Sequence, residues 1–166
     1  ASKIEMKGIA RRGATGADFA GADAGDAGFL VMMNEIIQTR PDVHRGWLEA
    51  ELDAQIFLAD LGNANAVSKM ADDQTEGVDR KVLWASLYRD ENRVNKLTLD
   101  FIFNDKVKTM LKASTAFLAK KKKFGKRKAL RPESVWDDMA RKVLKARGLT
   151  SPIGKIDGVP LSQYKK

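Results

Sequence analysis

The chain contains no cysteine among its 166 residues. This absence excludes disulfide bonds, thiolate nucleophiles, and zinc or iron–sulfur sites built on cysteine ligands. The single histidine, His44, leaves a metal site without a second imidazole, and we interpret it as a partly exposed helix residue. The adjacent acids Asp72–Asp73 and Asp137–Asp138 would diverge on a helix, so they do not form a catalytic carboxylate pair. The sequence therefore predicts no catalytic residue, metal or cofactor, and a protein that is not an enzyme.

Long apolar runs are also absent. None approaches the roughly 20 residues that a bilayer-spanning helix needs, and residues 1–13 lack the apolar core of a signal peptide. An apolar content of 43% is nevertheless enough for an ordinary packed core. The length suits one domain, or one lobe and part of another.

Acidic residues are missing from one stretch of the chain, and the rest of the chain has equal numbers of acidic and basic residues. The segment from Lys120 to Arg131 holds eight basic residues and no acidic one, which equals the whole net charge of +8. Without these eight residues, the chain has 22 basic side chains against 22 acidic ones. Because a nucleic-acid interface spreads its charge along a face, we interpret this basic run as a solvated loop between helices. A basic nucleic-acid-binding module is the less favoured alternative.

The stretch from Gly28 to Leu61 is the centre around which the chain is organised. Phe29–Met33 is a short apolar run bounded by Gly28 and Asn34, a pattern typical of a strand covered on both faces. Pro41 is then well placed in the first turn of a helix. This helix carries two apolar stripes at helical spacing: Val43, Trp47, Ala50, Ala54, Phe57 and Leu61, and beside them Leu48, Leu52, Ile56 and Ala59. Such a wide apolar arc predicts that the helix packs against a sheet or a helix layer.

The rest of the chain predicts an alternation of short helices and strands. Helices are expected up to Lys7, after Asn63 or Asn65, from Asp79, after Asn104, and from Pro132 to Gly148; strands are expected at Ile9–Ala14 and Leu97–Phe103. The glycine-rich segment from Gly13 to Gly28 predicts a loop without a phosphate-binding motif, and residues 149–166 an irregular surface tail. On the helix after Asp79, Trp84 and Tyr88 share one stripe, which suits either core packing or a ligand pocket.

Three segments in this order carry a resemblance to a known family. They are GFLVMMNEIIQTRPDVHRGWLEAELDAQIFL, GVDRKVLWASLY, and KTMLKASTAFLAKKK followed by LRPESVWDDMARKVLKARGL. Together they resemble the carboxy-terminal half of a periplasmic substrate-binding protein of an ABC transporter, of the nitrate/sulfonate/taurine type, over about residues 1–150. The resemblance implies an α/β fold, namely the helix-rich second half of the first lobe of a type II periplasmic-binding-protein fold. Residues 1–27 would be a post-hinge helix, strand and loop, residues 28–148 the lobe segment, and residues 149–166 the tail.

The resemblance also implies a function. The family holds a small anion or organic solute in a cleft between two lobes, and Phe29, Trp84 and Tyr88 are the residues of this chain expected to contact it. The implied partners are an ABC permease and the amino-terminal half of the fold, so the chain is expected to be a fragment. It would contact the membrane only through the permease, bind no nucleic acid, and lie in the periplasm or be lipid-anchored outside the cell membrane. An enzyme on the same scaffold, of the desulfinase, decarboxylase or pyrimidine-synthesis type, is the alternative.

Overall fold

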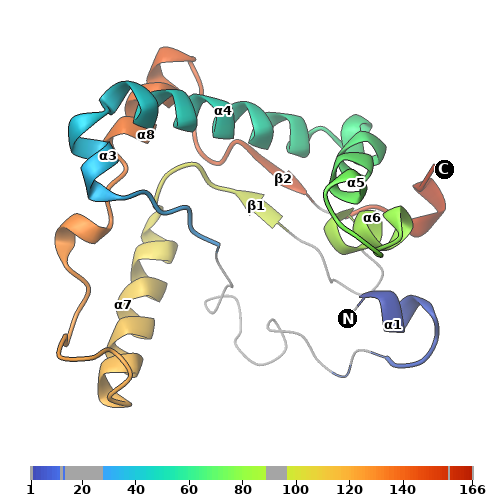
Figure 1. Ribbon diagram of the computed structural model, residues 1–166, viewed down its shortest axis with the longest axis horizontal. Coiled ribbons are helices and arrows are strands. Elements are labelled where there is room, and N and C mark those ends of the chain that lie inside the picture. Colours follow the sequence, from blue (N-terminus) through green and yellow to red (C-terminus); the bar gives the residue numbers. More distant parts are fainter. Residues whose placement is uncertain (1, 12, 14–27, 89–96, 157, 166) are drawn as a thin grey trace. The chain divides into compact units, whose positions relative to one another are not determined.

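The computed structural model describes residues 2–11, 13, 28–88, 97–156 and 158–165 (Figure 1). Its helices are α1 (Ser2–Met6), α3 (Asn34–Thr39), α4 (Pro41–Ala59), α5 (Ala64–Asp73), α6 (Arg80–Tyr88), α7 (Asp105–Lys120) and α8 (Asp138–Ala146). Short 3-10 turns are η2 (Leu61–Asn63), η3 (Pro132–Ser134) and η4 (Leu161–Gln163), and the strands are β1 (Leu97–Leu99) and β2 (Gly154–Ile156). The protein is mostly helical with one small antiparallel sheet, a helix-rich α/β domain, as the sequence predicted at this coarse level.

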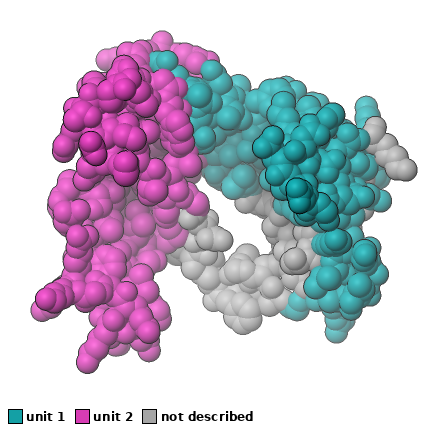
Figure 2. Space-filling model, in the orientation of Figure 1, with its two compact units in different colours: residues 1–13, 49–99, 150–166 teal, residues 14–48, 100–149 magenta. Residues whose placement is uncertain are grey.

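The chain divides into two compact units, shown in different colours in Figure 2. Unit 1 contains residues 1–13, 49–99 and 150–166, and unit 2 contains residues 14–48 and 100–149. Helix α4 contributes its first turns to unit 2 and the remainder to unit 1. The division into 1–27, 28–148 and 149–166 that the resemblance implies stays a prediction.

Unit 1 has a core built from helices α5 and α6 and from the carboxy-terminal segment. Helix α5 packs against α6, and β1 pairs antiparallel with β2, with Leu97 opposite Ile156 and Leu99 opposite Gly154. A Cβ at Gly154 would lie 2.6 Å from the Cβ of Ala59, so the strand passes the end of α4 too closely for any side chain at this position. The buried core residues are Ala64, Trp84, Ala85, Tyr88, Ile156 and Val159.

The last carbonyl groups of α4 accept hydrogen bonds from side chains outside the helix. The carbonyl oxygen of Phe57 accepts a hydrogen bond from the Asn63 side-chain amide at 3.1 Å, and that of Leu58 accepts one from the Tyr88 hydroxyl at 3.4 Å. The last carbonyls of a helix have no partner within it, so these two side chains hold the end of α4 against α6 and η2.

In unit 2, two polar residues at the starts of α7 and α8 form hydrogen bonds that fix the local backbone. Asn104 caps α7, because its Oδ1 accepts a hydrogen bond from the backbone N–H of Val107 at 2.9 Å. The carboxylate of Asp137 accepts hydrogen bonds from the backbone N–H of Phe103 at 3.0 Å and from Arg141 Nε and Nη2 at 2.8 and 3.0 Å. Asp137 therefore ties the segment before α7 to the start of α8. The buried residues of this unit are His44, Phe101, Thr115, Ala140, Val143 and Leu144.

The predicted helices are largely confirmed, including α4, which begins at Pro41, and α7, which Asn104 caps. The helix predicted from Pro132 is wrong at its start, because Pro132 begins only the turn η3 and α8 begins at Asp138. Its predicted end is confirmed: Gly148, at φ 65°, adopts the left-handed conformation that stops the helix.

The strand predictions fail more often than the helix predictions. Residues 29–33 lie outside any strand and four of the five are exposed, so the strand predicted there, covered on both faces, is wrong. Residues 9–11 and 13 also lie outside any strand, while positions 12 and 14 of that predicted strand and residues 14–27 of the predicted glycine-rich loop fall outside the described residues. The strand predicted over Leu97–Phe103 ends at Leu99. The expected irregular tail is wrong for Gly154–Ile156, which forms β2 and buries Ile156.

Candidate functional site

Two of the predicted ligand-binding residues lie together in the core of unit 1. Trp84 and Tyr88 are one helical turn apart on α6, and their ring centroids are 6.2 Å apart. Tyr164, from the carboxy-terminal segment, meets Trp84 edge-on at 5.8 Å. Trp84 is 1% exposed and Tyr88 0% exposed. The structure therefore places both side chains as packed core residues, and their contact with a solute stays a prediction.

The polar atoms of this aromatic cluster differ in how they are satisfied. The Nε1 donor of Trp84 is buried and has no acceptor among the described residues. The Tyr88 hydroxyl donates to the carbonyl of Leu58, and burial raises the pKa of Tyr88 to about 12, which keeps the phenol neutral. At the edge of the cluster, Arg80 Nε donates to the Tyr164 hydroxyl at 3.4 Å, and this hydrogen bond raises the pKa of Arg80 further. The cluster offers neutral aromatic surface, one unsatisfied donor and one guanidinium.

Phe29, the third predicted ligand-binding residue, belongs to unit 2. Its ring stacks on Phe103 with centroids 5.9 Å apart and an interplanar angle of 21°. It is 40% exposed, so one part of the ring is available to a solute while the other rests on Phe103. Of the three predicted residues, Phe29 is thus the one with an accessible surface in this structure.

His44 is buried, at 7% exposure, and the prediction of a partly exposed residue is wrong. The centroid of its ring lies 5.4 Å from that of the Trp136 ring, in the segment that precedes α8. Nδ1 of His44 has no hydrogen-bond partner among the described residues. Anywhere within the described residues, no three His, Asp or Glu side chains form a group that could hold a metal ion. His44 is therefore a core residue beside an aromatic ring.

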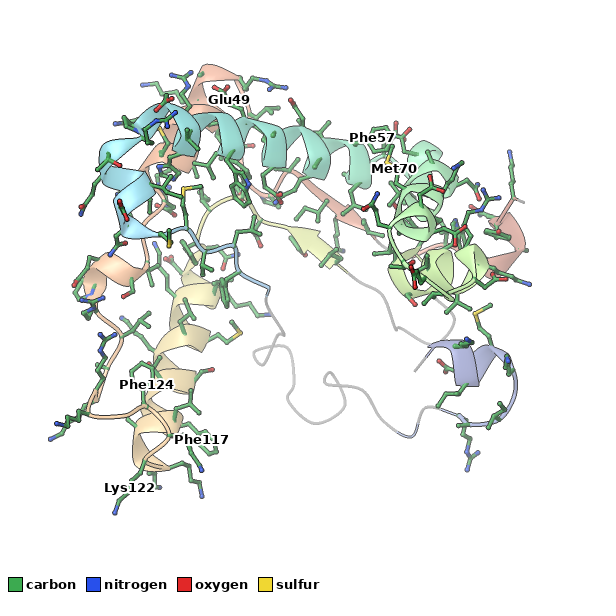
Figure 3. All side chains as sticks on the ribbon, in the orientation of Figure 1. Glu49, Phe57, Met70, Phe117, Lys122 and Phe124 are labelled. Atoms are coloured by element: carbon green, nitrogen blue, oxygen red, sulfur yellow. The ribbon has the colours of Figure 1, made fainter. Side chains whose placement is uncertain are left out.

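One apolar stripe on α4, continuing into η2, is partly exposed. We call it the α4 apolar face, and it consists of the first predicted stripe: Val43, Trp47, Ala50, Ala54, Phe57 and Leu61. Figure 3 labels Phe57 near the end of this helix. In the second stripe Leu52 is fully buried and Leu48 and Ala59 are half-buried, whereas Ile56 is 37% exposed. Helix α4 thus keeps partly exposed apolar side chains beside its buried ones.

Sequence reasoning missed Tyr164 and Arg80. The glycines and prolines of residues 149–166 predict an irregular tail, although Ile156, Val159 and Tyr164 place apolar side chains at intervals through it. Those intervals were a usable sign that the segment packs. Arg80 carried no local signal, because its contact with Tyr164 joins positions 84 residues apart.

Comparison with known proteins identifies no relative: no family model, curated protein or solved structure matches this chain. Within the described residues, none of the helices combines the length and apolar character required to cross a membrane.

Proposed function

We propose that this chain is part of the solute-binding component of an ABC uptake system, and that it binds a small anion or organic solute in a cleft between two lobes. The resemblance of three ordered sequence segments motivates the proposal. The helix-rich α/β fold is compatible with the helix-rich second half of the first lobe of a type II periplasmic-binding-protein fold. In this arrangement solute binding draws the lobes together, and the permease recognises the closed state.

The observation that carries the proposal is the exposed α4 apolar face. Monomeric soluble proteins rarely leave a large contiguous apolar patch in water, and such patches mark surfaces that pack against something else. Here the four large side chains of the face are each 37–42% exposed, Trp47 and Phe57 among them. In the proposed fold, strands and helices from a segment outside these 166 residues cover this face and complete the lobe.

The proposed site assigns different roles to the three aromatic residues. Phe29 contacts the solute directly, because it keeps exposed ring surface while Phe103 supports it from the other side. Trp84 and Tyr88 act from within the core of unit 1, where the Tyr88 hydroxyl donates a hydrogen bond to the carbonyl of Leu58 near the end of α4.

A ligand screen tests the proposal on the complete gene product. Nitrate, alkylsulfonates, taurine and pyrimidine-like compounds are added, and unfolding is followed by circular dichroism and binding by calorimetry. A ligand that binds only the native state stabilises it by RT ln(1 + L/Kd), where L is the free ligand concentration, so the melting temperature rises with the logarithm of that concentration once it exceeds Kd. Phe29→Ala is expected to lower the affinity about tenfold, on the order of the transfer free energy of part of an aromatic ring, whereas Val31→Ala, at an exposed neighbour, leaves it unchanged. If none of these solutes raises the melting temperature, the proposal fails.

A second test asks whether the α4 apolar face is covered in the complete protein. If further residues cover the face in the complete protein, Phe57→Asp buries a charge and destabilises that protein by more than about 2 kcal/mol. The same substitution in the 166-residue chain, where Phe57 is already 37% exposed, should cost at least about 1 kcal/mol less than in the complete protein. Equal, small effects in both proteins would mean that nothing packs on α4.

A further inference from the structure

The end of α7 and the loop that follows it form a strongly basic surface. We call residues 117–128 the basic tip; it contains seven basic residues, no acidic one, and all seven are exposed. Among the described residues, no carboxylate forms an ion pair with any of the seven, whereas Arg131, just beyond, pairs with Glu133 at 3.5 Å. The positive charge of the basic tip is therefore exposed, and no ion pair in the described part of the chain neutralises it.

The backbone at the end of α7 places a lysine in a conformation that glycine usually takes. Lys122 has φ 55°, its N–H donates to the carbonyl of Ala119 at 3.0 Å, and the N–H of Lys123 donates to that of Leu118 at 2.9 Å. This is the bonding pattern of a Schellman helix end, in which the left-handed position is most often glycine. A residue with a Cβ is less favourable than glycine in this conformation, and the sequence nevertheless has a lysine there.

Exposed apolar side chains lie among these charges. Phe117 is 59% exposed and Leu118 is also exposed, while Phe124 is half-buried. The ammonium group of Lys121 lies 5.7 Å from the centre of the Phe117 ring. Figure 3 shows Phe117, Lys122 and Phe124 gathered at the carboxy-terminal end of α7. The basic tip thus combines a dense cluster of cations with an aromatic side chain that reaches into solvent.

We propose that the basic tip binds the surface of a bilayer that contains anionic lipids. Clusters of four to eight Lys or Arg residues on a helix end are attracted to such surfaces, and a Phe and a Leu beside them can enter the boundary between headgroups and acyl chains. A nucleic acid fits less well, because the charge is confined to one helix end instead of following a face along which a phosphate backbone could run. The proposal does not depend on the solute-binding function, since it rests on the charges and exposed rings of residues 117–128 alone.

Vesicle flotation with the whole chain tests this surface. The probes are vesicles of phosphatidylcholine mixed with phosphatidylglycerol, vesicles of phosphatidylcholine alone, and a single-stranded oligonucleotide at the same salt concentration. The charge variant replaces four lysines of the basic tip with glutamine, and the control variant replaces four exposed lysines elsewhere. The charge variant is Lys121→Gln, Lys122→Gln, Lys123→Gln and Lys126→Gln; the control is Lys7→Gln, Lys81→Gln, Lys142→Gln and Lys145→Gln.

The expected result is binding to the anionic vesicles that weakens as salt rises. Each basic residue near an anionic surface raises the partition coefficient about fivefold, so the charge variant should bind several hundredfold more weakly, and the control far less so. Phe117→Ser should reduce the part of the binding that persists at high salt. Lys122→Gly should bind about fivefold more weakly while its melting temperature stays equal or rises, which separates lost charge from lost folding.

Three results would overturn the proposal. These are equal binding to neutral and anionic vesicles, an equal loss of binding in the charge and control variants, and tighter binding to the oligonucleotide than to the anionic vesicles. Absence of binding to any vesicle by the unmodified chain, with its circular dichroism spectrum intact, would overturn it as well.

Discussion

Replacing Trp84 distinguishes a tryptophan that fills the core from one that uses its indole nitrogen. The side chain is 1% exposed and packs against Tyr88 and Tyr164. Trp84→Ala should therefore cost about 3–5 kcal/mol, the usual range for removing a fully buried large aromatic side chain.

Trp84→Phe should cost much less. The change removes a few apolar ring atoms, which costs about 2 kcal/mol at the usual value for buried hydrocarbon. It also removes an N–H group that has no acceptor among the described residues, and an unsatisfied buried donor costs about 1–3 kcal/mol. The two effects nearly cancel, so the expected net change is about 1 kcal/mol or less.

Urea unfolding of the 166-residue chain, followed by far-ultraviolet circular dichroism, measures both changes without depending on tryptophan fluorescence. With a slope of about 2 kcal/mol per molar urea, Trp84→Ala should lower the midpoint by about 2 M and Trp84→Phe by less than about 0.5 M. Trp47→Phe, at an exposed site on α4, is the control and should change the free energy of unfolding by less than about 0.5 kcal/mol. If Trp84→Phe costs as much as Trp84→Ala, the indole N–H has a bonded partner and the reasoning is refuted.

Two further predictions concern Tyr88 and Asp137. Burial raises the folded pKa of Tyr88 from 10.0 to about 12, so its stability contribution is complete below pH 10, declines as the unfolded phenol ionises first, and is gone by about pH 12. Tyr88→Phe should remove this part of the alkaline loss, and the difference between the two denaturation curves across that interval measures it; parallel curves would contradict it. Asp137→Ala should destabilise by about 1–3 kcal/mol, because the half-buried N–H of Phe103 loses its acceptor. Arg141→Ala removes only the exposed partner of the same carboxylate and should cost less than about 1 kcal/mol, so equal costs in thermal unfolding would show that the ion pair dominates.

Local signals were sufficient for most helices of this fold. Pro41 and the two apolar stripes predicted α4, and Asn104 predicted the start of α7, because caps and helical spacing depend on residues close together in sequence. The apolar run at residues 29–33 was misleading, since five apolar residues between two breaking residues suit an exposed segment as well as a buried strand. The pairing of β1 with β2 joins distant segments, and no local pattern specifies such a partner.

The candidate site was predictable to a similar extent. The four-residue spacing of Trp84 and Tyr88 correctly predicted that their rings meet. The same spacing left core packing and a ligand pocket both open, and their burial, to which Tyr164 and Val159 contribute from the far end of the chain, agrees with core packing. The burial of His44 likewise depends on the Trp136 ring, which lies in a different helix–turn segment. Tertiary neighbours, which sequence spacing does not reveal, decide whether a side chain at a site is accessible.

The division of the chain between the two units has a consequence for synthesis and for proteolysis. Unit 1 takes its residues from three separated stretches, and its sheet pairs Leu97 with Ile156. A ribosome therefore has to release β2 before this sheet can form, so helices α5 and α6 emerge long before the strand that completes their core. By the same reasoning, cleavage near Thr150 would remove Ile156 and Val159 from that core while leaving the sequence of unit 2 intact.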